Sequence, residues 1–167
     1  IRTAPYAFKG FMGMRNFVME TADGKKLAWA NTNWTYLTIS TGIPTRLTPA
    51  DTDGYVLSEK LEMDYAPRKI KLPEDMIPQE AFVVQKHHLD TNHHVNNCQY
   101  ICMAEDFLPT DFKIYQMRAE YKMQAKLGDA ICPKVKTEAE KIVLSLDDTE
   151  GKPYAIVEFQ HKKQELL

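Results

Sequence analysis

The chain has 167 residues, of which 44% are hydrophobic and 26% are charged, with a formal charge of −2. This length allows one domain or two small ones with a buried core. So balanced a charge gives no reason to expect nucleic acid or a membrane surface as a partner. No run of eighteen apolar residues and no signal peptide are visible, so we expect no membrane insertion.

The cysteines and the first residue give two further expectations. Three cysteines without CxxC spacing indicate reduced thiols and a cytoplasmic location. Ile1 is not an initiator residue, and the residues after it resemble the inside of an extended segment. We therefore expect an N-terminal piece to be missing.

The first third of the sequence predicts long strands. Residues 8–21 are rich in aromatic residues and methionine and predict one strand that bends at a glycine. Residues 22–25 contain an Asp-Gly pair, which favours the positive φ of a hairpin turn. Residues 26–40 predict the returning strand. Thr48 followed by Pro49 predicts the start of a short helix.

The rest of the chain predicts a linker followed by an α+β unit. Residues 58–79 contain three prolines, many charges and little periodicity, which is typical of an extended linker. A strand at about 80–88, a polar cluster and a buried helix that ends before Pro109 come next. Strands are then expected at residues 113–125, 130–141, 142–146 and 154–161. A helix followed by antiparallel strands implies an α+β fold in which a curved sheet covers the helix.

This element order predicts two similar units. Residues 80–167 hold a complete unit, whereas residues 1–57 hold only the strand half of one. The first unit is therefore expected to be incomplete at its N-terminus.

The most polar stretch places Asp90, Asn92 and His94 at alternate positions. In an extended or loosely turned segment these side chains point to one side. A carboxylate, an amide and an imidazole gathered at one spot can orient and deprotonate a water molecule. The alternative is a polar loop whose side chains cap turns and the start of the helix at Asn96 or Asn97. The residues alone leave both interpretations open.

Two other groups of residues are weaker candidates. Four histidines, at positions 87, 88, 93 and 94, suggest a metal site, but adjacent histidines on an extended chain point to opposite faces. We therefore favour a site without metal. Cys98 and Cys102 lie four residues apart on the predicted helix and are expected to be small buried residues. Cys98, in the first helical turn, is the only cysteine considered as a nucleophile.

Residues 90–100, DTNHHVNNCQY, match the pattern D-x-N-x-H-V-N-N-x-x-Y without a gap. This run resembles the hallmark of the acyl-acyl carrier protein thioesterases. The resemblance extends to FKGFMGMRNF at residues 8–17, to the strand DGKKLAWANTNWTYL after it, and to Glu120-Tyr121-Lys122 and Gly128-Asp129. It covers nearly all of the chain and places it on the C-terminal two thirds of a typical member. It implies tandem hot-dog units, each a long helix wrapped by an antiparallel sheet.

The resemblance also implies an activity. Members of the family hydrolyse the thioester between a fatty acyl chain and the phosphopantetheine arm of acyl carrier protein, which ends chain elongation. No cofactor is expected, and acyl carrier protein is the expected partner. A homodimer is one option for the assembly. An acyl-CoA thioesterase of the same fold and a non-catalytic module that binds the acyl chain or the carrier remain alternatives.

The resemblance places Asp90, Asn92 and His94 on catalytic positions. We expect Asp90 and Asn92 to orient His94 and a water molecule, whose proton His94 takes. Backbone N–H groups near Asn96 and Asn97 are expected to stabilise the oxyanion, at about 3 kcal/mol for a good donor. Asp90 as the base, with His94 polarising the carbonyl, is a variant that the sequence does not separate from this scheme.

One departure from the family pattern bears on this mechanism. Where many members have Glu followed by Cys or Ser, this chain has Gln124 and Ala125. Neither residue can act as a nucleophile, so direct attack by water is expected, with Gln124 as a hydrogen-bonding group. Trp34 and Tyr36 are candidates for an acyl pocket, although aromatic residues on a long strand more often belong to a core.

Overall fold

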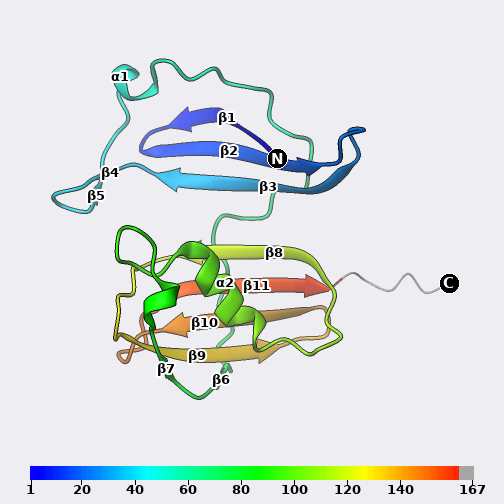
Figure 1. Ribbon diagram of the computed structural model, residues 1–167, viewed down its shortest axis with the longest axis vertical. Coiled ribbons are helices and arrows are strands. Elements are labelled where there is room, and N and C mark those ends of the chain that lie inside the picture. The colour runs from blue at the N-terminus through cyan, green and yellow to red at the C-terminus, as the bar shows by residue number, and fades with distance from the viewer. Residues whose placement is uncertain (162–167) are drawn as a thin grey trace. The chain divides into compact units, whose positions relative to one another are not determined.

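The computed structural model describes residues 1–161. It divides into two compact units, Ile1–Ala66 and a second one that begins at Pro67 (Figure 1). Both units are built on antiparallel sheets, and helices occur in both. The fold is therefore mixed α+β, as predicted. Within residues 1–161, no helix is long and apolar enough to cross a membrane.

The first unit is a three-stranded sheet in the order β1-β2-β3, formed by β1 (Arg2–Lys9), β2 (Met12–Glu20) and β3 (Lys26–Thr35). The single strand expected at residues 8–21 was wrong. The chain reverses at Gly10, whose φ of +63° suits a residue without a side chain, and strands β1 and β2 pair with each other. The hairpin turn at Gly24, with φ +87°, is confirmed.

Short elements follow this sheet. They are β4 (Leu37–Thr38), β5 (Ile43–Pro44) and the helix α1 (Pro49–Thr52), which begins at the predicted proline. Asp51 Oδ2 accepts the Thr48 N–H at 2.8 Å, which caps the helix. The returning strand expected at residues 26–40 ends earlier than predicted, at Thr35, and Leu37–Thr38 then pairs with Ile43–Pro44.

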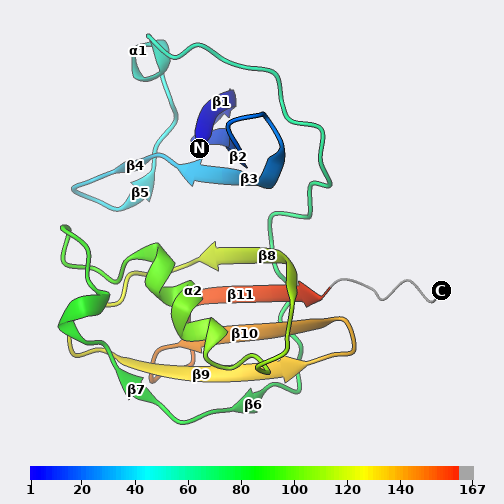
Figure 2. The ribbon, with the colours of Figure 1, turned by 45° about the vertical axis from the view of Figure 1, so that its right-hand side comes forward.

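The second unit is a six-stranded sheet with one helix across one face (Figure 2). The main order is β6-β9-β10-β11-β8, and β7 also pairs with β9. In chain order the elements are β6 (Ile77–Pro78), β7 (Phe82–Val83), a 3₁₀ helix (Lys86–His88), α2 (Asn97–Glu105), β8 (Ile114–Tyr121), β9 (Ala130–Thr137), β10 (Lys141–Asp147) and β11 (Pro153–His161). The strands expected at residues 113–125, 130–141, 142–146 and 154–161 are confirmed with shifted ends.

Two predictions were wrong, one for the strand before the helix and one for the residue at which the helix ends. The strand expected at residues 80–88 is reduced to Phe82–Val83, because the chain then turns into the 3₁₀ helix, where His88 Nδ1 accepts the Gln85 N–H at 2.9 Å. The helix expected to reach Leu108 ends at Glu105 and continues as a turn.

One side of α2 packs against the sheet, and the other side is exposed. Tyr100, Met103 and Ala104 are buried, whereas Cys98 and Cys102 are exposed. The expectation that both cysteines are buried was therefore wrong. The long wrapped helix that the resemblance implies for the second unit is also not clearly seen, since α2 has nine residues.

The core of the second unit has a layer on each face of the sheet. On the α2 side, Leu144 and Phe159 pack in one cluster with Ala104. On the opposite face, Val143 and Ile156 pack against Ile70. The central strands β10 and β11 are therefore covered on both faces, which accounts for their continuous apolar runs.

The stretch predicted as a linker, residues 58–79, has contacts in each unit. In the first unit, Asn16 Oδ1 accepts the Leu61 N–H at 3.1 Å and the Tyr65 hydroxyl at 3.3 Å. In the second unit, Arg118 Nη2 donates to the Pro67 carbonyl at 2.6 Å, and Glu120 Oε2 accepts the Ile70 N–H at 3.1 Å. These bonds fix both halves of the stretch to sheets rather than leaving them free in solvent.

Candidate active site

The predicted catalytic residues lie in a tight loop immediately before α2. Leu89 and Val95 form an antiparallel bridge that closes this loop. Inside it, the Asp90 N–H donates to the His94 carbonyl at 2.9 Å and the His93 N–H to the Asp90 carbonyl at 3.1 Å. His93 has a φ of +61°, the left-handed conformation of a tight turn. The segment is therefore tightly turned rather than extended, and the gathering of the three side chains at one spot stays a prediction.

Asp90 holds this loop through its side chain. Its Oδ1 atom accepts the N–H of Asn92 at 2.8 Å and the N–H of His94 at 3.3 Å. This is the turn-capping role considered as the alternative interpretation. Asp90 and His94 are half-buried and Asn92 is exposed. Within residues 1–161, no hydrogen bond joins the side chains of these three residues to one another.

The start of α2 provides backbone donors beside the loop. Asn96 caps the helix, because its Oδ1 accepts the Cys98 N–H at 2.8 Å, as predicted for Asn96 or Asn97. The Asn96 N–H itself donates to the His88 carbonyl at 2.9 Å. The Asn97 N–H has no acceptor among the described residues, and it is the donor at the helix start that remains available to a ligand.

Residues 124 and 125 lie beside the loop, although they are about thirty residues away in sequence. The Val95 N–H donates to the Ala125 carbonyl and the Ala125 N–H to the Tyr100 hydroxyl, both at 2.9 Å. Ala125 is completely buried and Gln124 is exposed. The structure thus brings the backbone of this segment to the predicted catalytic loop.

Two tyrosines hold this arrangement together. Tyr100, the aromatic position of the motif, is 1% exposed and its hydroxyl joins α2 to Ala125. The Tyr121 hydroxyl donates to the Asn97 carbonyl at 3.2 Å, and burial together with the nearby Cys98 thiol raises the pKa of Tyr121 to about 12. In the sequence these residues are the last position of the motif and part of the Glu-Tyr pair, but neither pattern indicates a positioning role.

The histidines before the loop form no ligand set. The rings of His87 and His88 lie 4.1 Å apart, and partial burial, with the neighbouring ring, lowers the pKa of His88. In the described part of the chain, no group of three or more His, Cys, Asp or Glu side chains is arranged to hold a metal ion.

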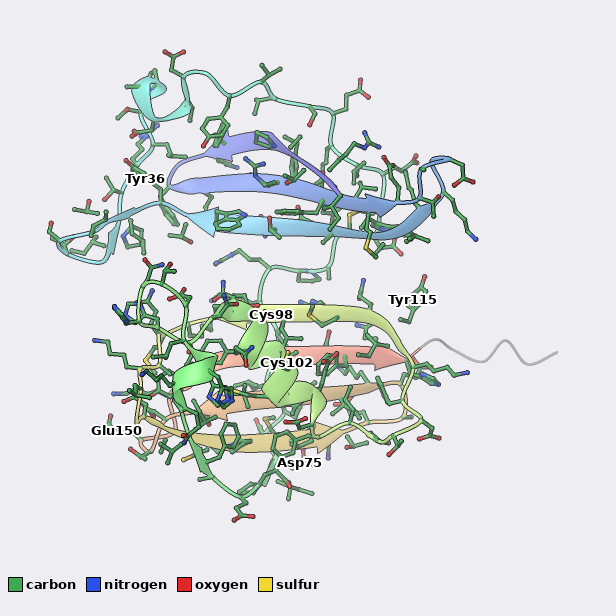
Figure 3. The ribbon with its side chains drawn as sticks, viewed as in Figure 1. Tyr36, Asp75, Cys98, Cys102, Tyr115 and Glu150 are labelled. Carbon is green, nitrogen blue, oxygen red and sulfur yellow. The ribbon has the colours of Figure 1, made fainter. Side chains whose placement is uncertain are left out.

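The aromatic candidates for an acyl pocket lie in the first unit. Trp34 Nε1 donates to Thr32 Oγ1, and the Tyr36 hydroxyl donates to Asp51 Oδ1, both at 2.8 Å (Figure 3 labels Tyr36). The hydrogen bond to Asp51 raises the pKa of Tyr36. Trp34 is 58% exposed and Tyr36 41%, so neither belongs to a core of this unit. A role for them in binding an acyl chain stays a prediction.

Comparison with known proteins identifies the family. The family model of the acyl-ACP thioesterase C-terminal domain matches residues 71–163, which contain the loop and α2. No curated protein sequence matches the chain.

Two crystal structures share its fold. An acyl-ACP thioesterase from Bacteroides thetaiotaomicron has a TM-score of 0.82 and 19% identity, over 96% of this chain and 67% of that one. A protein described as an oleoyl thioesterase from Lactobacillus plantarum has a TM-score of 0.75 and 19% identity, over 95% of this chain and 66% of that one. The chain thus spans about two thirds of the length of each. The match of the family model over more than half of the chain shows that this protein belongs to the acyl-ACP thioesterase family.

Proposed function

We propose that the protein hydrolyses the thioester between a fatty acyl chain and acyl carrier protein, releasing free fatty acid and ending elongation. The observation that carries the proposal is the closed loop at residues 89–95, which holds Asp90 and His94 at the start of α2 within the segment that matches the family. The cytoplasmic location and the homodimer considered from the sequence belong to the same proposal.

We also propose that the two units are tandem hot-dog units. Residues 80–167 are assigned to the second, of which 162–167 lie outside the described residues; residues 58–79 connect the two, and residues 1–57 are the strand half of the first. The position of α2 across one face of an antiparallel sheet supports this assignment for the second unit (Figure 2).

The proposed mechanism is direct attack by water. His94 takes a proton from water as its oxygen attacks the thioester carbonyl carbon. The Asn97 N–H stabilises the oxyanion, a contribution of about 3 kcal/mol for a well-placed donor. The tetrahedral intermediate then expels the phosphopantetheine thiolate, which receives the proton from His94. Asp90 keeps the backbone of His94 in place and provides a negative charge near the imidazole, and Asn92 helps to orient the water.

Gln124 and Ala125 support attack by water. Ala125 is buried, and both of its backbone polar groups are hydrogen-bonded, to Tyr100 and Val95. We therefore propose that it holds these neighbouring segments in place and takes no part in the reaction itself. Gln124 is exposed beside it and is proposed to hydrogen-bond the water. The same two residues favour a second candidate, a non-catalytic module that binds acylated carrier protein, because the positions that often carry Glu and Cys hold no ionisable group here.

The test is hydrolysis of acyl carrier protein thioesters of several chain lengths by the full-length protein. We expect the wild type to release free fatty acid, and His94→Ala and Asp90→Asn each to lose about a hundredfold or more in kcat. Asn at position 90 retains an Oδ1 acceptor for the two loop N–H groups, so a loss in that variant reports the charge rather than the fold. His87→Ala is the matched control, because His87 is exposed and lies outside the loop.

Three other results would contradict the proposed site, the proposed activity or the proposed substrate. Activity that survives both substitutions would refute the site and direct attention to Cys98. Absence of turnover with retained binding of the acylated carrier would favour the binding module. Faster turnover of acyl-CoA than of the carrier thioester would make the protein an acyl-CoA thioesterase.

A further inference from the structure

The helix that follows the catalytic loop presents two thiols on its open side. Cys98 and Cys102 are both exposed, and they lie four residues apart on α2 (Figure 3). Residues at this spacing are neighbours on one side of a helix. The mechanism proposed above uses neither thiol, and neither belongs to the core clusters.

Helical geometry places the two cysteines within reach of a disulfide. A rise of 1.5 Å per residue and 3.6 residues per turn put Cα atoms at this spacing about 6 Å apart. Disulfides join Cα atoms that are roughly 4.4–6.8 Å apart. The Cys98 side chain also affects Cys102. Partial desolvation and then the Cys98 thiol raise the pKa of the Cys102 thiol.

We propose that Cys98 and Cys102 are a redox-active dithiol, which closes to a disulfide within α2 by exchange with a small disulfide of the glutathione class. One cysteine thiolate attacks the small disulfide, forms a mixed disulfide and expels one small thiolate. The second cysteine thiolate then attacks the protein sulfur and expels the other. Two protein thiols are oxidised, one external disulfide is reduced to two thiols, and the protons pass to the released thiolates.

Closure of this bond would change the start of the helix. Cβ atoms four residues apart on a helix are separated by about 5–6 Å, whereas a disulfide holds them at roughly 3.5–4.5 Å. The helix must therefore tighten between the two cysteines. That segment contains Tyr100, whose hydroxyl holds Ala125, and it adjoins Asn97, whose carbonyl accepts the Tyr121 hydroxyl. A strained, exposed disulfide is also readily reduced, which makes the change reversible.

The third cysteine is a matched control. Cys132 lies on β9, is only partly exposed and pairs across the sheet with Asp147. It shares no helix with the other two thiols. We therefore expect it to stay reduced in the same treatment.

The experiment is incubation of the full-length protein with oxidised glutathione, followed by a count of free thiols and mass analysis of the peptide that contains residues 98–102. We expect the number of free thiols to fall from three to one and this peptide to lose two hydrogens. Cys132→Ser should behave in the same way, with no free thiol left. Cys98→Ser and Cys102→Ser should form no internal disulfide. Three unreacted thiols, separate glutathione adducts on the two cysteines, or a linkage to Cys132 would overturn the proposal.

The effect on activity rests on the proposed function and is measured separately. Hydrolysis of the carrier thioester by the oxidised wild type should be lost and should return with dithiothreitol, while the two single variants stay active. A disulfide that forms without changing hydrolysis would refute the link between α2 and the catalytic loop. If the reduced protein hydrolyses nothing, the proposed function fails, whereas the thiol count still decides whether the dithiol exists.

Discussion

Buried carboxylates of the second unit are held by cations. Glu158, 3% exposed, accepts from Arg118 Nη1 at 2.8 Å and from Lys141 Nζ at 3.4 Å. Asp147, 2% exposed, pairs with Lys134 at 2.8 Å. An unpaired charge at either position would be costly to bury. Within residues 1–161, no buried side-chain nitrogen or oxygen atom lacks a hydrogen-bond partner.

Glu158 is therefore expected to make stability depend on pH. Burial acts to raise its pKa, but hydrogen bonds from Arg118 and Gln160, together with the charges of Arg118 and Lys141, outweigh burial, and the pKa lies below its usual value. A carboxyl group of this kind stabilises the fold above its unfolded pKa of about 4.3, and the contribution is lost as the pH falls through the lower folded value. Glu158→Gln should lower the free energy of unfolding at pH 7 by about 3 kcal/mol, measured by urea denaturation.

A pH series completes this test. The difference between Glu158→Gln and the wild type should shrink progressively as the pH falls below about 4, because Glu158 becomes neutral first in the unfolded and then in the folded protein. Glu150→Gln is the control, since Glu150 pairs with Lys152 at the surface and such pairs contribute little. Equal losses in the two variants, or a difference that does not change with pH, would contradict the assignment.

At the level of elements, α2 connects the loop at residues 89–95, the predicted catalytic loop, to the segment after β8. The helix is short, so packing and capping rather than length must stabilise it. Asn96 caps its start, and Tyr100, Met103 and Ala104 bury one side. A change in how this helix sits is expected to reach the loop through Val95 and Ala125, whose backbones are bonded.

Tyr100→Phe tests this connection. Phenylalanine fills the same space but leaves the Ala125 N–H without its acceptor, which should cost about 1–3 kcal/mol in unfolding free energy. Hydrolysis should also fall, because Ala125 holds Val95 next to the loop. Denaturation and kinetics of the same preparation measure both effects. Tyr115→Phe is the control, since Tyr115 is 69% exposed on β8 and its loss should change little. Similar behaviour of the two variants would refute a positioning role for Tyr100.

At the level of the whole molecule, the two units differ in how well their sheets are covered. Six of the seven residues of β10 are buried, whereas no residue of β3 is. Local opening is easiest where few apolar contacts must be broken. The second unit should therefore contain the most stable part of the described chain.

Hydrogen exchange of the full chain should show this difference. Amides of β10 and β11 should exchange slowest, and those of β3 should exchange orders of magnitude faster, because their opening requires less loss of buried surface. Mass spectrometry of peptides from each strand measures both rates in one sample. Equal protection of β3 and β10 would show that the open face of the first sheet is covered in solution.

Elements whose signals are local were predictable from the amino-acid sequence. Strands at 130–141, 142–146 and 154–161 were predicted with shifted ends, and the Asp-Gly pair at Gly24 predicted its turn. Thr48 and Pro49 marked the start of α1, and Asn96 was one of the two predicted caps of α2. Each of these depends on the conformational preferences of neighbouring residues, which the sequence displays directly.

How distant parts of the chain meet could be seen only in the folded protein. The pairing of β1 with β2 and the packing of residues 58–79 both depend on partners that the local pattern does not name. The same holds for the contact between Ala125 and Val95 and for the exposure of Cys98 and Cys102. A helix with apolar residues on several sides has no unique buried face until the sheet covers one of them. Burial and proximity belong to the folded chain as a whole, whereas turn and strand preferences belong to short segments.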